Sequence, residues 1–121
     1  NEYSKAEESY IHARDISSQI GHQPGVAQAL QGMGQVHSAR EEYTMAAQSY
    51  LEAEQIYQRI GDIRSFVDII WCKAWLHRHE AQYDVAERFA RQASTIYGGL
   101  GLEQNKEKCD EFLEEIRSLI T

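Results

Sequence analysis

The chain has 121 residues, of which 42% are hydrophobic and 26% charged, which suits a single domain or part of a longer array and allows a buried core. Its formal net charge of −7 argues against a surface for nucleic acid or anionic membranes, because phosphate groups bind clustered Lys and Arg. No stretch approaches the roughly 18 consecutive apolar residues of a membrane-spanning helix.

The cysteines and the first residue bear on the protein's setting. Cys72 and Cys109 stand alone rather than in a CxxC pair, which favours a reducing environment, so we expect a cytoplasmic location. Asn1 is not a Met and no charged-then-apolar leader follows it. This start predicts a piece of a longer protein with no visible targeting segment.

A period of 40 residues runs through the whole sequence. Shifting the sequence by 40 brings like residues into register without a gap, which predicts stacked copies of one structural unit. The matched triplets are Tyr3, Tyr43 and Tyr83; Ala6, Ala46 and Ala86; Ala13, Ala53 and Ala93; Ile16, Ile56 and Ile96; and Gly21, Gly61 and Gly101.

The first three predicted elements are helices. Apolar residues at helical spacing predict a helix over 2–20 and a second over 24–40, with Pro24 suited to its first turn. A short turn then leads into a helix over 43–60. Gly61 suits its end because glycine readily takes a positive φ.

The second half of the chain repeats this pattern. It predicts helices over 63–80 and 83–97 and a last one over 103–120, giving six helices and no strand. We therefore expect one array over residues 1–121. Its parts are the second helix of a truncated repeat (1–22), two repeats (24–62 and 63–101) and a C-terminal capping helix (103–121).

The spacing within each repeat resembles the tetratricopeptide repeat (TPR). Leu30-x2-Met33-Gly34-x2-His37, followed by Ala46-x3-Tyr50-x2-Ala53, is similar to W-x2-L-G-x2-Y followed by A-x3-F. In departure from that pattern, His37 and His77 replace the usual Tyr, Ala74 replaces the Gly, and the helix-ending Pro is absent. The resemblance implies an all-α solenoid of antiparallel helix pairs, a TPR-like right-handed superhelix. The 40-residue period resembles the long repeats of polarity adaptors, kinesin light chains and the sensor segments of NLR-like ATPases.

Small residues in this pattern let the paired helices approach closely, while large ones fill the space beside the crossing. Tyr50, Ile56 and Ile60 are expected to fill the space between successive units. The residues expected at the helix crossings are Gly34, Ala46, Ala53, Ala74, Ala86 and Ala93.

The resemblance also implies a function, a non-catalytic scaffold module that binds a peptide or a partner domain. In TPR arrays the first helices of successive units line a groove, and residues of this sequence map onto it. The candidates are Gln28, Gln31, Gln35, Asp68, Trp71, Trp75, Arg78, His79, Lys108, Glu111 and Glu115. The Lys, Asn and Arg clamp of chaperone-binding members has no counterpart, because Gln31, Gln35, Asp68 and Cys72 stand where parts of it would be. Binding to a chaperone's acidic tail is therefore not expected.

Trp71 and Trp75 lie four residues apart and share a helix face. They either anchor a partner in the groove or pack against the preceding repeat, and the sequence leaves both interpretations open. Arg78 either pairs with an acidic ligand or lies over Trp75.

The sequence contains no complete motif for catalysis, nucleotide binding or metal binding, so no catalytic residue, cofactor or metal is expected. Gly32-Met-Gly34 lacks the third glycine and the preceding strand of a dinucleotide fingerprint, and Gly98-Gly99-Leu100-Gly101 lacks the Lys-Ser/Thr of a P-loop. His77 and His79 point in different directions on a helix, which disfavours a zinc site with Glu80. The separation of Cys72 from His77 disfavours a nucleophile and base pair.

The two ends of the array differ. The last helix places Cys109, Phe112, Leu113, Ile116, Leu119 and Ile120 on one stripe, with acids elsewhere, as suits a terminal cap. The opening helix, 2–20, is expected to leave Tyr3, Ala6, Tyr10 and Ala13 uncovered. It then either pairs with a second copy as a homodimer or frays and leaves a monomer of five helices. An alternative function is a regulatory, oligomerisation or sensor segment of a larger NLR-like signalling ATPase.

Overall fold

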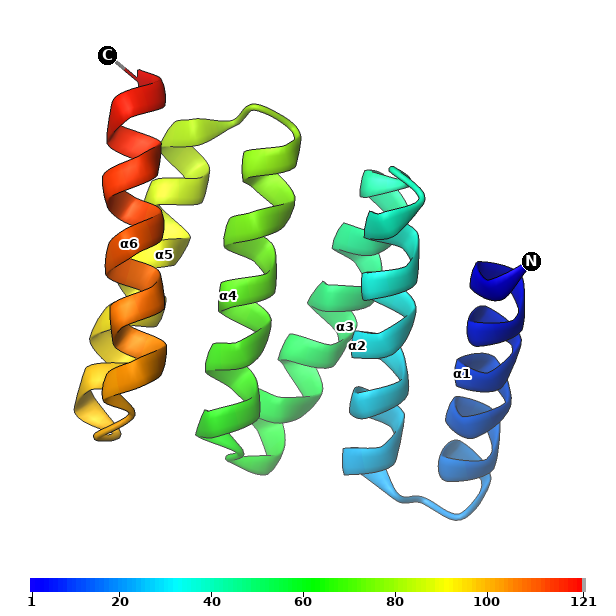
Figure 1. Cartoon of the computed structure of the whole chain (residues 1–121). Coiled ribbons are helices and arrows are strands. Elements are labelled where there is room, and N and C mark those ends of the chain that lie inside the picture. Colours follow the sequence, from blue (N-terminus) through cyan, green and yellow to red (C-terminus); the bar gives the residue numbers. More distant parts are fainter. Residues whose placement is uncertain (121) are drawn as a thin grey trace. The chain divides into compact units, whose positions relative to one another are not determined.

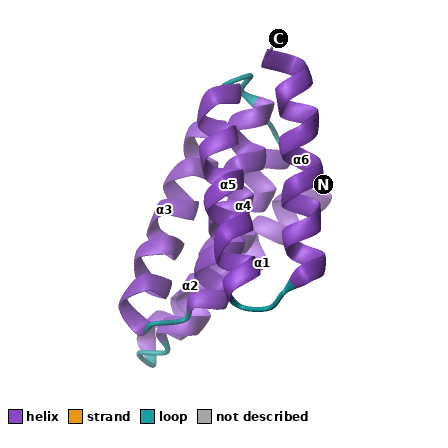
Figure 2. Cartoon of the chain, turned by 90° about the vertical axis from the view of Figure 1, so that its left-hand side faces the viewer, coloured by secondary structure: helices purple, strands orange, loops and turns teal. Residues whose placement is uncertain are grey.

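A computed structural model describes residues 1–120, which form six α-helices and no strand (Figures 1 and 2). The helices are α1 (Glu2–Gln19), α2 (Gln23–Ala39), α3 (Tyr43–Ile60), α4 (Ile63–His79), α5 (Tyr83–Gly99) and α6 (Glu103–Ile120). The all-α prediction is confirmed over these residues, and no helix end differs from its predicted position by more than about two residues.

The turns between helices use left-handed backbone at regular intervals. Gly21, Gly61 and Gly101 have φ angles of 72°, 76° and 74°. Between them, Glu41 (φ 64°) and Ala81 (φ 59°) take the same conformation without being glycine. Each of these residues reverses the chain after a helix, so successive helices within a unit run antiparallel.

The chain divides into two compact units. The N-terminal unit, residues 1–63, contains α1, α2 and α3, and α2 packs against both of its neighbours. Its core is formed by α2 and α3. The crossing residues Ala46 and Ala53 are fully buried, and Gly34 is also buried.

Two glycines of α2 each receive a tyrosine ring. A Cβ placed on Gly32 would lie 2.3 Å from Cε1 of Tyr10 in α1, and one on Gly34 would lie 2.6 Å from Cε1 of Tyr50 in α3. The expected location of Tyr50 between successive units is therefore wrong, because its ring covers Gly34 within this unit. The expectation that Tyr10 is uncovered is wrong for the same reason.

The C-terminal unit, from Arg64 onward, is formed by α4, α5 and α6. One core cluster joins Ala74, Ala86 and Ala90 to Phe112, Leu113 and Ile116, and a second joins Val67, Ile70, Ala93 and Tyr97 to Cys109. Phe112 stands 80 residues after Gly32, and Ala90 stands 80 after Tyr10. The large residue is therefore Tyr10 on α1 in the first helix pair and Phe112 on α6 in the second. The total side-chain volume at the crossing is conserved between the two pairs.

Candidate partner-binding surface

Three aromatic rings form a cluster between α4 and α6 in the C-terminal unit. The centroids of Trp71 and Trp75 lie 5.9 Å apart, and those of Phe112 lie 5.1 Å from Trp71 and 4.9 Å from Trp75. All three pairs meet edge to face, with interplanar angles of 76°, 68° and 72°, the favoured geometry for aromatic rings. The cluster is therefore well packed and rigid.

The two tryptophans differ in exposure. Trp71 is half-buried and packs against both core clusters, whereas 38% of Trp75 is exposed. Contacts within the C-terminal unit therefore bury much of the Trp71 side chain. Trp75 presents a large aromatic surface to solvent.

Arg78 completes this cluster. Its guanidinium carbon lies 5.1 Å from the ring centroid of Trp75 and 5.4 Å from that of Phe112, both within cation–π distance. Its Nη1 also donates to Oε2 of Glu115 at 2.8 Å. Arg78 therefore lies over Trp75 and is held there by a carboxylate of α6.

The other predicted groove residues of this unit are used differently. Asp68 accepts a hydrogen bond from the Tyr97 hydroxyl at 2.6 Å, so it stabilises the fold. Burial, followed by this bond to Asp68, raises the pKa of Tyr97. The His79 ring lies 6.1 Å from that of Trp75, while Lys108 and Glu111 are exposed on α6.

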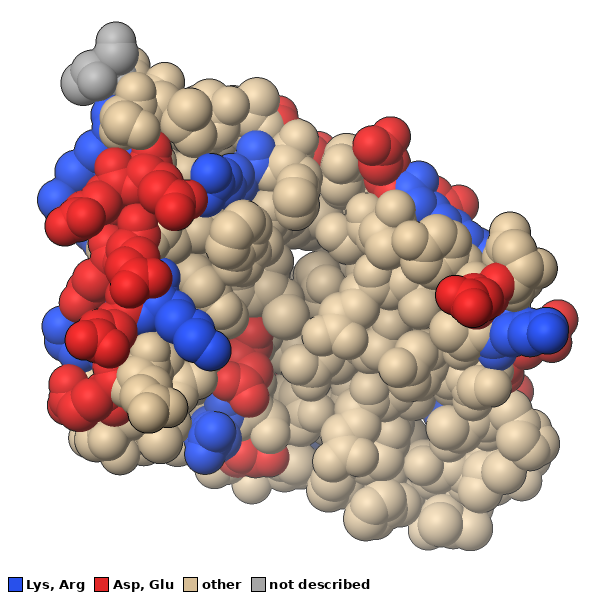
Figure 3. All heavy atoms as spheres, in the orientation of Figure 1, with Lys and Arg blue, Asp and Glu red and all other residues tan. Residues whose placement is uncertain are grey.

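The N-terminal unit carries the three predicted glutamines on α2. Gln28 and Gln35 are exposed, whereas Gln31 is half-buried and its Oε1 accepts from the Tyr57 hydroxyl at 3.4 Å. No Asp, Glu, Lys or Arg occurs in α2. Acidic side chains gather instead along α6 on the face drawn in Figure 3.

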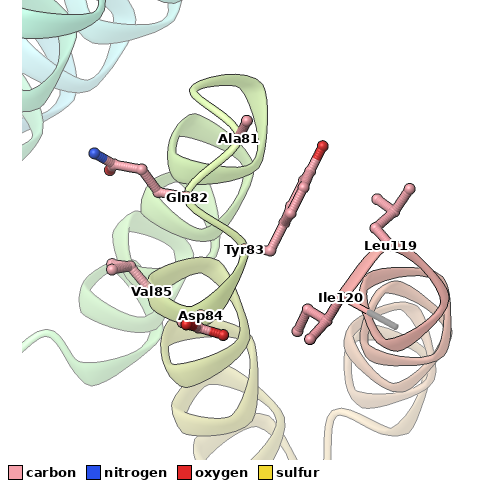
Figure 4. A pocket seen from close by; sticks show the side chains of 7 residues that line it. All are labelled: Ala81, Gln82, Tyr83, Asp84, Val85, Leu119 and Ile120. Atoms are coloured by element: carbon pink, nitrogen blue, oxygen red, sulfur yellow. The ribbon is translucent and has the colours of Figure 1, made fainter.

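A hollow of about 460 Å³ lies in the C-terminal unit, between the start of α5 and the end of α6 (Figure 4). Tyr83 at the start of α5 lies on the side of that helix that faces Leu119 and Ile120 at the end of α6. Leu119 and Ile120 are 46% and 45% exposed, so the apolar stripe predicted for α6 is buried only from Cys109 to Ile116. The hollow's titratable side chains are Asp84 and Tyr83, a poor set for catalysis.

Cys109 and His77 carry groups that can act in catalysis, but both are held in structural roles. Cys109 is fully buried, and burial raises the pKa of its thiol to about 12, which makes it a poor nucleophile. Nδ1 of His77 lies 2.7 Å from Oε1 of Gln82. Within residues 1–120 no three His, Cys, Asp or Glu side chains are grouped to hold a metal ion, and no helix is long and apolar enough to span a membrane.

Phe112 is the member of the aromatic cluster that the sequence pattern assigned only to the core. It is 2% exposed, yet it supports both Trp75 and Arg78. The 40-residue shift offered a signal, because Phe112 aligns with Cys72 and thus occupies a first-helix position.

The antiparallel helices and their 40-residue repeat define an all-α helical-repeat protein. The family model for the tetratricopeptide repeat matches residues 1–59, and the 40-residue repeat of the sequence continues beyond them. The fold is similar to that in the crystal structure of BtubC (BKLC) from P. vanneervenii, with a TM-score of 0.69 and 18% sequence identity. The likeness covers 98% of this chain and 58% of that one. No curated protein sequence matches.

Proposed function

We propose that this chain is a non-catalytic scaffold module that binds a peptide or partner domain on the surface of its first helices. Tetratricopeptide repeats are in general protein-interaction modules. The residues proposed for contact are Gln28, Gln31, Gln35, Trp71, Trp75, Arg78, His79, Lys108, Glu111 and Glu115. Asp68 is no longer a direct candidate, because it is bonded to Tyr97.

The observation that carries this proposal is the exposed Trp75 ring on a rigid aromatic support. Tryptophan and arginine are enriched at positions that dominate binding energy, and preorganised side chains lose little conformational entropy on binding. Trp75 is fixed by Phe112 and Trp71, and Arg78 is fixed by Glu115. A partner's side chain that covers Trp75 would gain contact area at small entropic cost.

The test begins with a displayed library of random peptides selected on the immobilised chain. The affinity of a selected peptide is then measured for the wild type and for Trp75→Ala, and we expect a loss of about tenfold or more, about 1.4 kcal/mol. Met45→Ala is the matched control, because Met45 is 50% exposed but lies on α3, a second helix. Equal affinities for Trp75→Ala and the wild type would remove Trp75 from the binding surface.

A second candidate function is oligomerisation, as in a regulatory segment of a larger NLR-like ATPase. It is favoured by α1, in which no residue is fully buried. Ala13 and Ile16 are exposed there, whereas their equivalents in α3, Ala53 and Ile56, are buried. A G-x-x-x-x-G-K-[ST] motif in the sequence upstream of Asn1 would support the ATPase.

A further inference from the structure

A buried histidine joins α1 to the end of α2 in the N-terminal unit. His37 is 3% exposed. Its Nδ1 lies 3.0 Å from Oε1 of Glu42, in the turn before α3, and its Nε2 lies 3.4 Å from Oε2 of Glu7 in α1. Carboxylates therefore face both nitrogens of one imidazole ring.

Arg40 supports the same arrangement from the end of α2. It donates to Oε1 of Glu7 and to Oγ of Ser4, each at 3.0 Å, and its Nη1 lies 3.7 Å from Oε1 of Glu42. Its guanidinium also lies 5.9 Å from the centre of the Tyr3 ring. Glu7 from α1, Arg40 from α2 and Glu42 from the turn are the charged groups facing His37.

The protonation state of the His37 ring decides whether it donates to one or to both of the carboxylates of Glu42 and Glu7. A neutral imidazole donates through one nitrogen only, whereas an imidazolium donates through both. An ionised carboxylate only accepts, so the two carboxylates are both satisfied only by the imidazolium. The bond from His37 lowers the pKa of Glu42, which keeps that carboxylate ionised.

We propose that His37 is a protonation-dependent latch that holds α1 against α2. When the ring loses one proton, the remaining one stays on Nδ1, where the contact with Glu42 is the shorter of the two. Nε2 then presents a lone pair to Glu7. The contact that the ring makes with α1 is therefore the one lost.

This contact matters because α1 is the least buried helix of the N-terminal unit. None of its residues is buried, in contrast to six in α3. Its packing on α2 centres on the half-buried Tyr10 over Gly32. Loss of the Glu7 contact leaves the helix attached through Arg40 and Tyr10, so the expected change is local opening of α1.

The second repeat supplies a natural comparison. His77 stands 40 residues after His37, but its Nδ1 faces an amide, Gln82, where His37 faces Glu42. The position 40 residues after Glu7 is Ala47, which has no carboxylate. Protonation of His77 therefore has no equivalent effect.

The experiment is amide hydrogen exchange of the whole chain at about pH 6 and about pH 8.5, corrected for the intrinsic exchange rate. We expect protection of the α1 amides to fall about threefold to tenfold at the higher pH, the scale of one partly buried charged contact. Protection in α2 and α3 should change less.

Three variants identify the group responsible. His37→Gln places an amide N–H toward Glu7 at any pH, so the pH dependence of α1 should disappear. Glu7→Gln can donate to a neutral ring and should reduce the dependence without altering the core. His77→Gln is the matched control and should leave it unchanged.

Two results would overturn the latch. One is equal protection of α1 at both pH values in the wild type. The other is a pH dependence that persists in both His37→Gln and Glu7→Gln.

Discussion

At the scale of single residues, the fit between Gly34 and Tyr50 shows how the two repeats of this chain accommodate residues of different size. The ring of Tyr50 occupies the space that any side chain at position 34 would need. The C-terminal unit has Ala74 and Ala90 at the equivalent places, both fully buried. A larger residue on one helix is thus accompanied by a smaller one on its partner.

Gly34→Leu is therefore expected to overpack this crossing and lower the free energy of unfolding by about 1–3 kcal/mol. Urea denaturation measures the loss. Gly99→Ala is the control, because a Cβ at Gly99 meets no atom within 4 Å. The penalty of Gly34→Ala should shrink when Tyr50→Ala is also present, and additive effects would show that the ring is not the obstacle.

Asp110 gives a prediction about acid stability. Its carboxylate accepts from Lys106 Nζ at 2.8 Å and from Ser94 Oγ at 2.7 Å, and these two bonds lower its pKa. A carboxyl whose pKa is lower in the folded state stabilises the fold above its unfolded pKa of about 3.9 and loses that effect as the pH falls through the folded value.

The variant Asp110→Asn should therefore show a shallower loss of stability between about pH 5 and pH 3 than the wild type. Thermal melting at a series of pH values measures the slope. Ser94→Ala removes one of the two donors and should change the slope in the same direction by less. An unchanged slope in Asp110→Asn would place the acid sensitivity elsewhere.

At the scale of elements, the turns made the helix ends predictable, whereas the covered face of α1 was not. The glycines at 21, 61 and 101 all adopt positive φ, so the repeat placed the ends within about two residues. Which face of α1 is covered depends on the side from which α2 approaches. The pattern therefore named Tyr10 as bare, whereas Ile16 is 46% exposed.

In the partner-binding surface, too, the exposure of a residue depends on contacts with a helix that is distant in the sequence. The spacing of Trp71 and Trp75 placed both on one face of a helix, as the structure shows. Their unequal exposure depends on Phe112, which lies on α6, two helices further along the chain. A local pattern contains no information on a contact of that sequence separation.

The backbone at Ala81 is strained, and a substitution at this position can relieve the strain. Its φ of 59° is unfavourable for a residue with a Cβ, whereas glycine adopts it freely. Ala81→Gly should raise the free energy of unfolding by up to about 1 kcal/mol, net of the chain entropy that glycine adds. The reverse change at another left-handed turn, Gly61→Ala, should lower it, and opposite signs in chemical denaturation would confirm the role of the backbone.

At the scale of the whole molecule, the uncovered side of α1 predicts self-association. Ile16 and Ile20 are 46% and 74% exposed and stand one turn apart. Light scattering over a concentration series should show a dimer that dissociates on dilution, and Ile16→Ser with Ile20→Ser should shift the midpoint to higher concentration. Leu51→Ser, on the exposed side of α3, is the control. A monomer at every concentration would contradict the homodimer.

Both tryptophans of the chain lie on α4, so the N-terminal unit contains none. Their emission therefore reports on the C-terminal unit alone, while far-ultraviolet circular dichroism reports on all six helices. Comparing the two signals during denaturation gives the order in which the units melt without any label. Because Trp75 is also the proposed anchor, a partner that covers it should change the same emission. Tryptophan fluorescence can therefore follow both unfolding and partner binding.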